Sequence, residues 1–243
     1  MLLKLNTLRQ KLAEDSALAN GCIIDTNVLF AATFELDPFN DWAEEVFNEL
    51  NSLKIPIFTN INIRSEFIEL NRRVLIPYGL RDLYETWGNE LDPKVEHSLK
   101  SLKTRMKTAL DEGKVFKISD AETKRYRVLL NEHARANHLL SWDGFCEVHF
   151  RPYITKVWDK AISMYNVQSL GTREIETKKY FNENPKWIDM VDIVGRTGIG
   201  TSDAMIINLF LKSKLPLIVT ADADVRDSVA SMMPKNKFIL APH

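Results

Sequence analysis

Short apolar runs that stop at polar turn residues alternate along the chain with longer segments of helical periodicity. The first run, residues 22–24, stops at Asp25, and further runs occupy residues 55–58, 215–220 and 237–240. Brief runs of apolar and β-branched residues, without polar alternation, are typical of strands buried on both faces of a parallel sheet. The pattern therefore predicts a central, mostly parallel sheet in which the last run is an edge strand.

Apolar residues spaced three and four positions apart predict helices between these runs. The first predicted helix covers residues 1–20. Each of the first two strands is followed by another helix, and Thr59 or Asn60 is the expected cap of the second. Two more are predicted at residues 185–195 and 204–211, with Thr201 or Ser202 as the expected cap of the second. This alternation of strands and helices indicates an α/β fold of three layers, α/β/α.

The segment from residue 77 to residue 184 differs, because helix signals follow one another there without a clear strand between them. Asp92-Pro93, Ser119-Asp120-Ala121-Glu122 and Arg151-Pro152 each open a predicted helix. The segment is therefore interpreted as a helical insertion or subdomain. The predicted organisation is residues 1–76 and 185–243 for the two parts of the α/β domain and residues 77–184 for the insertion.

The chain of 243 residues has the composition of an ordinary soluble globular protein, with 45% hydrophobic and 27% charged residues. Lys and Arg total 32 against 33 Asp and Glu, so any nucleic-acid binding must come from a local patch rather than from overall charge. No apolar run approaches the roughly 18 residues that span a bilayer, and the amino terminus lacks a basic leader followed by a long apolar block. The two cysteines form no disulfide or metal pattern. These features predict a cytoplasmic protein without a membrane partner.

One basic patch is predicted in the helical insertion. Between residues 100 and 127, nine basic residues stand against four acids. Such an excess usually marks only a solvated helix face, and the alternative is contact with nucleic-acid phosphates. The candidates for that contact are Lys103, Arg105, Lys107, Lys124, Arg125 and Arg127.

Four acidic residues follow the predicted strands or lie early in the helices that come next: Asp25, Glu66, Asp203 and Asp222. Taken singly, each has a structural interpretation, as a cap, a solvated helix residue or a carboxylate near a helix amino terminus. Because strand exits of a parallel sheet share one rim, we expect the four side chains to converge there. Two like charges about 4 Å apart repel by roughly 4 kcal/mol at an effective dielectric near 20, so the cluster requires a cation. An all-oxygen ligand set favours Mg²⁺ or Mn²⁺ over zinc.

Four segments of the chain resemble, in the same order, the motifs of PIN-domain nucleases. They are Asp25-Thr26-Asn27-Val28-Leu29, Ile61-Asn62-Ile63-Arg64-Ser65-Glu66-Phe67, Ser202-Asp203-Ala204-Met205-Ile206 and Val219-Thr220-Ala221-Asp222-Ala223-Asp224. The resemblance covers about residues 20–76 and 185–243. It implies a PIN-like α/β/α fold and a metal-dependent endoribonuclease that hydrolyses single-stranded RNA to 5′-phosphate and 3′-hydroxyl ends.

The resemblance also implies a role for individual residues. Asp224 would be a further or alternate metal ligand. Asn27 would orient Asp25 through its amide, and Thr220 would position the attacking water or a carboxylate. The catalytic cluster that holds Mg²⁺ or Mn²⁺ would consist of Asp25, Glu66, Asp203 and Asp222.

The long insertion departs from the pattern of compact PIN domains, since Glu66 and Asp203 are 137 residues apart. The toxin role of some compact members is therefore not carried over to this chain. We hypothesise instead that the insertion forms a wall or lid over the acidic rim and selects RNA through its basic residues. Reversing the charges of Lys103, Arg105 and Lys107 is then expected to weaken RNA binding.

Two other functions stay open at this point. One is a non-catalytic RNA-binding or scaffold module on the same fold, and the other is a flap or single-strand DNA nuclease on a related fold, because no feature reads a 2′-hydroxyl. A haloacid-dehalogenase phosphatase is disfavoured, since it needs a second Asp at the position of Asn27. The sequence also leaves open an inhibitory protein partner and the formation of homo-oligomers.

Overall fold

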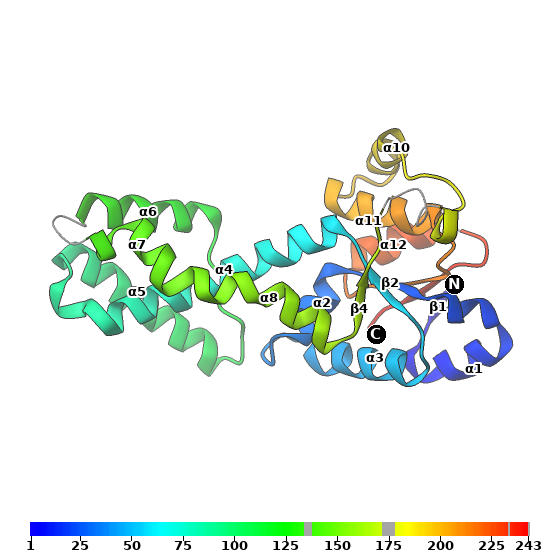
Figure 1. Cartoon of the computed structure of the whole chain (residues 1–243), viewed down its shortest axis with the longest axis horizontal. Helices are drawn as coiled ribbons and strands as arrows, with labels where there is room; N and C mark the ends of the chain where they lie inside the picture. Colours follow the sequence, from blue (N-terminus) through cyan, green and yellow to red (C-terminus); the bar gives the residue numbers. More distant parts are fainter. Residues whose placement is uncertain (134–137, 172–177, 233, 243) are drawn as a thin grey trace. The chain divides into compact units, whose positions relative to one another are not determined.

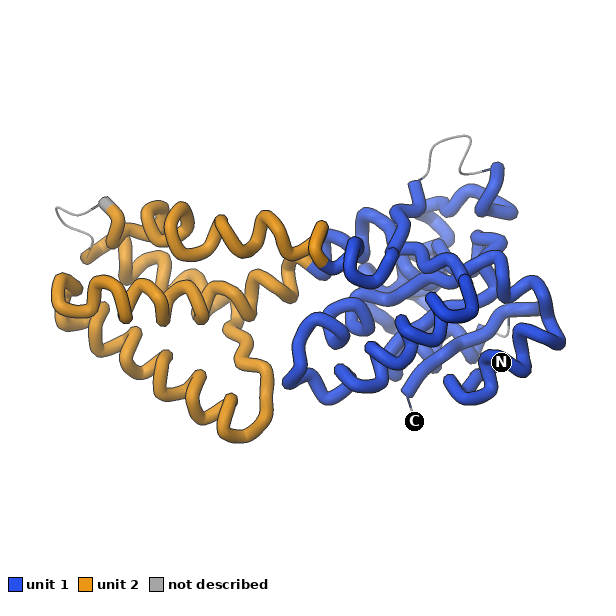
Figure 2. The backbone as a smooth tube through the Cα atoms, turned by 60° about the horizontal axis from the view of Figure 1, so that its bottom comes forward, with its two compact units in different colours: residues 1–67, 161–243 blue, residues 68–160 orange. Residues whose placement is uncertain are grey.

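The computed structural model describes residues 1–133, 138–171, 178–232 and 234–242. The chain divides into two compact units (Figure 2). Unit 1 comprises Met1–Phe67 and Ala161–His243, and unit 2 comprises Ile68–Lys160.

Unit 1 is built on a six-stranded sheet in which all the strand pairs are parallel. The strand order is β1-β6-β5-β2-β3-β4. This confirms the α/β fold class with a central parallel sheet. The strands are β1 (Leu2–Leu3), β2 (Cys22–Ile24), β3 (Ile57–Thr59), β4 (Val167–Ser169), β5 (Leu217–Val219) and β6 (Phe238–Leu240).

Strand β2 lies at the point in the sheet where the order of strand addition reverses. The chain leaves β2 toward β3 and β4 on one side, and it later adds β5 and β6 on the other side. Cys22 pairs with Ile57 in β3 and with Leu217 in β5, so β2 has a neighbour on each edge. In open parallel sheets, ligands bind at such a reversal, outside the carboxyl ends of the strands. The exits of β2 and β5 therefore define the place for a site.

Helices cover both faces of the sheet. Figure 1 shows α10, α11 and α12 on one face and α1 and α3 on the other. Ile23, Phe58 and Ile218 pack in one cluster with buried residues of α10, α11 and α12, and alternation along a strand directs their neighbours to the opposite face. The helices of unit 1 are α1 (Leu8–Glu14), α2 (Thr26–Ala32), α3 (Asn40–Ser52), α10 (Trp187–Thr197), α11 (Thr201–Lys212) and α12 (Ala223–Ser231).

The amino-terminal segment does not form the single helix predicted for residues 1–20. Leu2–Leu3 pairs in parallel with β6, and only Leu8–Glu14 is α-helical, with 3₁₀ turns at Leu5–Thr7 and Ser16–Asn20. The prediction of an edge strand at residues 237–240 was wrong for the same reason, because β1 covers the outer side of β6. Helical spacing of leucines can thus be outweighed by an available sheet edge.

Helix α10 continues beyond its predicted end. It runs to Thr197 and terminates at Gly198, whose φ of 70° is the left-handed conformation that glycine adopts easily. Gly195 lies inside the helix, where it costs helix propensity without ending it. The structure also places Gly200, not Thr201 or Ser202, at the cap position of α11.

Unit 2 is helical. Its core contains Leu80, Leu99, Leu102, Tyr126 and Phe145. The helices that lie in it wholly or in part are α4 (Ile61–Trp87), α5 (Pro93–Asp111), α6 (Asp120–His133), α7 (Trp142–Phe145) and α8 (Arg151–Met164), together with a π-helical turn at Cys146–Phe150 and 3₁₀ turns at Gly88–Glu90 and His138–Leu140.

The starts and ends of the helices in unit 2 were predicted only in part. Asp92 caps α5 and the Ser119–Glu122 capping box opens α6, as predicted. Helix α4 continues through Pro77 to Trp87, since Leu80 and Leu83 are fully buried and their packing offsets the hydrogen bond that proline removes. Helical structure before α8 already starts at Trp142 rather than at Arg151.

The bounds of unit 2 differ from the predicted insertion of residues 77–184. Residues 68–76 of α4 belong to unit 2, and residues 161–184 belong to unit 1. The second difference has a simple cause, because Val167–Ser169 forms β4 and pairs with β3. Among the described residues, no helix combines the length and apolarity needed to cross a bilayer.

Candidate functional site

Asp25 occupies the exit of β2. Its backbone N–H donates to Val219 O of β5 at 2.9 Å, and its side chain, only 2% exposed, caps α2. Oδ1 accepts the N–H of Thr26 at 2.6 Å, and Oδ2 accepts the hydroxyl of Thr220 at 2.6 Å. Both carboxylate oxygens are therefore held by groups at the ends of the two central strands.

Thr220 connects Asp25 to the next acid. Its hydroxyl donates to Asp25 and accepts the backbone N–H of Asp222 at 3.0 Å. Asp222 caps α12, because its Oδ1 accepts the N–H of Asp224 at 2.7 Å. The predicted position of Thr220 beside a carboxylate agrees with these contacts.

Glu66 lies one and a half turns into α4 and is held by two hydroxyl groups. Its Oε2 accepts Thr26 Oγ1 at 2.8 Å and Ser202 Oγ at 3.1 Å. Thr26 follows Asp25 in the chain, and Ser202 precedes Asp203. Hydrogen bonds and adjacent residues thus connect four acids: Asp222 before α12, Asp25 after β2, Glu66 in α4 and Asp203 in α11.

Asp203 lies in the first turn of α11 and is half-buried. Among the described residues, no hydrogen bond to its carboxylate is found, so its lone pairs are available. Gly200 lies close to it, since a Cβ at that glycine would lie only 3.2 Å from Asp203 Oδ2. A side chain at position 200 would therefore crowd this carboxylate.

The pKa values of two acids indicate that their charges interact. The pKa of Asp25 is raised to about 7, chiefly by burial and in part by the nearby charges of Glu66 and Asp203, against the lowering effect of its two hydrogen bonds. Burial also raises the pKa of Asp203 to about 6, helped by the charges of Glu66, Asp222 and Asp224. No basic side chain is among these causes in the described part of the chain. Negative charges from the predicted acids therefore act on both Asp25 and Asp203.

Asn27 and Asp224, the other residues to which the resemblance gave a role, act on different groups. Asn27 accepts the backbone N–H of Ala221 at 3.0 Å through Oδ1, so its amide binds the chain after β5 rather than holding Asp25 as the resemblance implied. Asp224 is exposed, and its charge acts on Asp203. Asn27 thus fixes the exit of β5 beside that of β2.

The oxygen ligands that the acidic cluster offers are of the type that hard divalent cations prefer. Its members are carboxylates, and no hydrogen bond from a described residue acts on the carboxylate of Asp203. Over the described ranges, no three side chains of Asp, Glu, His or Cys are already arranged around a common ion position. Asp25 and Glu66 instead make hydrogen bonds to Thr and Ser hydroxyls, so rotation of side chains would have to accompany ion binding.

Sequence reasoning missed the two hydroxyl residues that hold Glu66. Thr26 was only part of the first segment, and Ser202 was interpreted as a cap for α11. Their signal was their position, since each neighbours an acid of the cluster in the chain. A hydroxyl next to a clustered acid is well placed to hold the acid that comes from another element.

The predicted phosphate-binding residues of unit 2 fall into three groups. Lys103 pairs with Glu85 at 3.0 Å, and Arg105 pairs with Glu122 at 2.7 Å. Arg125 and Arg127 lie over the rings of Tyr126 and Trp142. Lys107 and Lys124 make no ion pair with a described residue. The available positive charge is therefore smaller than the residue count suggested.

Comparison with known proteins adds no relative. No family model, no curated protein and no solved structure matches this chain.

Proposed function

We propose that this protein is a metal-dependent endoribonuclease that cleaves single-stranded RNA at the acidic cluster of unit 1. The gathering of acids around Asp25 and Asp203 supports the proposal most strongly, because the charge of Glu66 raises the pKa of both carboxyl groups. A fold gains nothing in stability by burying like charges without a partner. Sites of this kind are more often retained for binding or catalysis.

Asp203 and Glu66 would hold a Mg²⁺ or Mn²⁺ ion together with Asp25 or Asp222, and Asp224 is an alternate ligand. Such an ion, when bound, lowers the pKa of water and offsets charge on the phosphoryl oxygens. Thr220 and Thr26 fix the orientation of Asp25 and Glu66, which keeps the carboxylates at the strand exits. The free thiols Cys22 and Cys146 fit a reducing compartment such as the cytoplasm.

The test is cleavage of a 5′-labelled single-stranded RNA by the purified chain with Mg²⁺ or Mn²⁺. We expect internal cuts, products with 3′-hydroxyl ends and loss of cleavage in EDTA. Asp203→Asn should lower the rate by about a hundredfold or more, because several kcal/mol of charge stabilisation are lost. Asp227→Asn is the matched control, since Asp227 is exposed and pairs only with its neighbour Arg226.

The same experiment decides between the alternatives. Cuts in single-stranded DNA but not in RNA would assign the site to a DNA nuclease. RNA binding without cleavage, equal in the wild type and in Asp203→Asn, would support a scaffold module instead. That module is favoured only by the hydrogen bonds that occupy Asp25 and Glu66 in this arrangement.

A further inference from the structure

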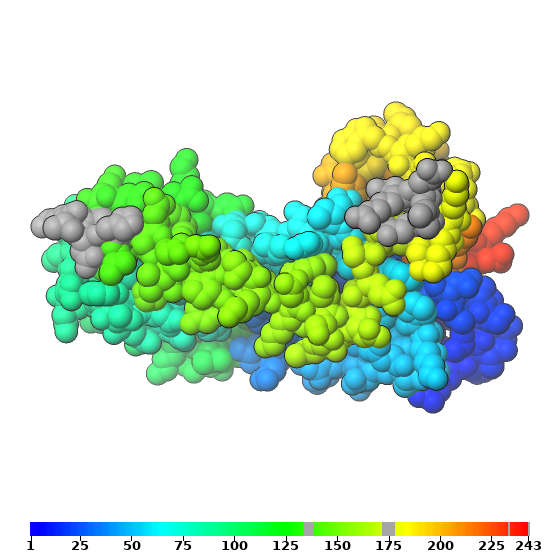
Figure 3. Space-filling view, in the orientation of Figure 1, coloured from blue at the N-terminus to red at the C-terminus, as the bar shows by residue number. Residues whose placement is uncertain are grey.

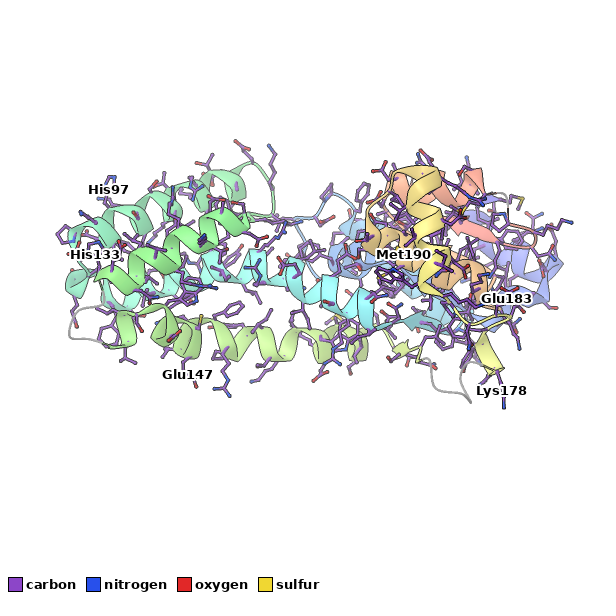
Figure 4. All side chains as sticks on the ribbon, turned by 90° about the horizontal axis from the view of Figure 1, so that it is seen from above. His97, His133, Glu147, Lys178, Glu183 and Met190 are labelled. Carbon is purple, nitrogen blue, oxygen red and sulfur yellow. The ribbon has the colours of Figure 1, made fainter. Side chains whose placement is uncertain are left out.

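A cavity lies beside the acidic cluster in unit 1, at the carboxyl ends of β3 and β4. Its volume is about 370 Å³. The start of α4, the end of β4 and the helices α10 and α11 form its walls, and Figure 4 marks Met190 on α10. The residues that matter here are Asn60, Asn62, Ser169, Trp187, Met190 and Met205.

The rim of this cavity is apolar and exposed. Trp187 is 65% exposed at the first position of α10, and Ile61 is 69% exposed at the start of α4. Ile188 and Val191, which do not line the cavity, are also exposed on α10, whereas the lining residue Met190 is buried. Figure 3 shows α10, in yellow, at the surface of unit 1. Large apolar side chains gathered at a concave place commonly mark a binding site.

Polar and basic groups accompany this apolar rim. Lys186 precedes Trp187, and its backbone carbonyl accepts Asn208 Nδ2 at 3.0 Å, which holds the start of α10. The ammonium group of Lys186 forms no ion pair with any side chain that the structure describes. Asn62 and Ser169 add an amide and a hydroxyl to the walls. The cavity thus offers an aromatic face, a positive charge and hydrogen-bonding groups together.

The cavity is one helical turn away from the acids. Asn62 precedes Glu66 by four residues on α4, and Met205 follows Ser202 by three on α11. Side chains at these spacings are neighbours, about 5–6 Å apart at Cβ. The hydrogen bond between Ser202 and Glu66 at 3.1 Å joins the two helices there. A nucleotide whose phosphate lay at the acids could place its base in the cavity.

We propose that the cavity binds one unpaired nucleobase of the substrate strand, with Trp187 as the stacking face and Lys186 beside a flanking phosphate. The proposal rests on the nuclease function proposed above. An exposed aromatic side chain next to a cation is the usual means of binding single-stranded nucleic acid, because every base has a face that stacks. The charge of Lys186 favours this occupant over an apolar protein segment.

The test measures the affinity of the full chain for a labelled single-stranded 12-nucleotide oligoadenylate in EDTA, where metal-dependent cleavage cannot occur. Trp187→Ala should weaken binding by about 5- to 150-fold, which corresponds to the loss of one stacked base. Trp187→Phe should recover most of this loss, because it keeps an aromatic ring. A strand of equal length without bases should bind the wild type and Trp187→Ala equally.

Tyr153→Ala provides the control, since Tyr153 is a 54% exposed aromatic residue of unit 2. It should leave the affinity for both strands unchanged. Equal affinity of the wild type and Trp187→Ala for oligoadenylate would overturn the proposal. A protein partner would then be the alternative occupant of the cavity. Equal weakening toward both strands would also overturn it, because the effect would then not depend on bases.

The two proposals can fail separately. A base-dependent loss in Trp187→Ala, found in a protein that never cleaves RNA, would keep the nucleobase cavity and refute the nuclease. Cleavage of RNA with the same Michaelis constant in the wild type and Trp187→Ala would keep the nuclease and refute the cavity.

Discussion

The carboxyl group of Asp25 is buried beside other acids, and its pKa near 7 has a consequence for stability. In the unfolded chain an Asp has a pKa of about 3.9. Between these two values the folded protein binds more protons than the unfolded one, so the free energy of unfolding falls as the pH rises. The contribution of Asp25 is most unfavourable above pH 7, where the buried group is charged. Asp203, with a pKa of about 6, acts in the same direction over a lower range.

Asp25→Asn is therefore expected to raise the melting temperature of the metal-free protein at pH 8. An asparagine can still accept the N–H of Thr26 and can donate to the hydroxyl of Thr220, so both contacts survive without the charge. Each kcal/mol gained corresponds to about 2–4 °C in a domain of this size. Calorimetry at pH 5 and pH 8 checks this. A variant that melts lower than the wild type at pH 8 would show that the charge is compensated.

Divalent cations should stabilise the wild type more at pH 8 than at pH 5. The carboxylates must lose their protons to bind an ion, and a ligand that binds only the folded state raises the melting temperature. Melting temperatures measured with and without roughly 5–10 mM MnCl₂ at both pH values give the stabilisation by the ion. Asp203→Asn should strongly reduce the rise in melting temperature that Mn²⁺ causes, and Asp227→Asn should leave it unchanged. The same shift in both variants would place the ion elsewhere.

At the scale of elements, the end of α11 depends on a side chain from another part of the chain. Lys237 Nζ donates to Phe210 O, Ser213 O and Leu215 O at 2.7–2.8 Å. Phe210 lies in the last turn of the helix, and Ser213 and Leu215 follow it, where carbonyl groups have no partner further along the helix. A cation at a helix carboxyl end also interacts favourably with the helix dipole.

Lys237→Met should lower the free energy of unfolding by about 2–3 kcal/mol, because it leaves buried carbonyl groups without a charged donor. Urea denaturation measures this loss. Lys235→Met is the matched control, since Lys235 is exposed and close in sequence. Equal stability of both variants would mean that water replaces the ammonium group at the end of α11.

The helices of unit 2 allow a test of the basic patch. Lys107, Lys124 and Arg125 form no ion pair with a described residue, whereas Lys103 and Arg105 are paired with acids. If this face binds RNA, changing the first three to Gln should lower the salt dependence of binding by up to about two units of slope, at about 0.7 per phosphate contact.

Lys103→Gln with Arg105→Gln is the comparison for that variant. It should change the slope less, because their charges are already offset by Glu85 and Glu122. Titration of a labelled single-stranded RNA at several salt concentrations gives both slopes. An unchanged slope in the triple variant would leave unit 2 without a direct role in binding.

At the scale of the whole molecule, the sequence predicted the sheet and the identity of the clustered acids. A run of buried apolar residues such as residues 22–24 is typical of a strand covered on both faces of a parallel sheet. The carboxyl ends of such strands lie on one edge of the sheet, where the acids follow them. The partners of those acids were not predictable. The contact of Glu66 with Ser202 joins residues 136 positions apart, and periodicity within a segment carries no information about such pairs.

The elements that were mispredicted share a physical cause. Leu2–Leu3 has only two residues, and Val167–Ser169 has one buried residue followed by two exposed ones, so neither shows a run of buried apolar residues. Each pairs with a neighbouring strand instead. Pro77 and Gly195 are helix breakers in isolation, yet both lie inside helices in the structure. Tertiary packing decided these cases against local preference.

The pairing of β1 with β6 links folding to protein synthesis. The amino group of Met1 donates to Lys237 O at 2.9 Å, and Ile239 N–H donates to Met1 O at 3.0 Å. Because the ribosome makes β1 long before β6, β1 can complete the sheet only after Phe238–Leu240 have been synthesised. Contacts between residues so distant in sequence form slowly, so the outer part of the sheet is expected to be the last to assemble.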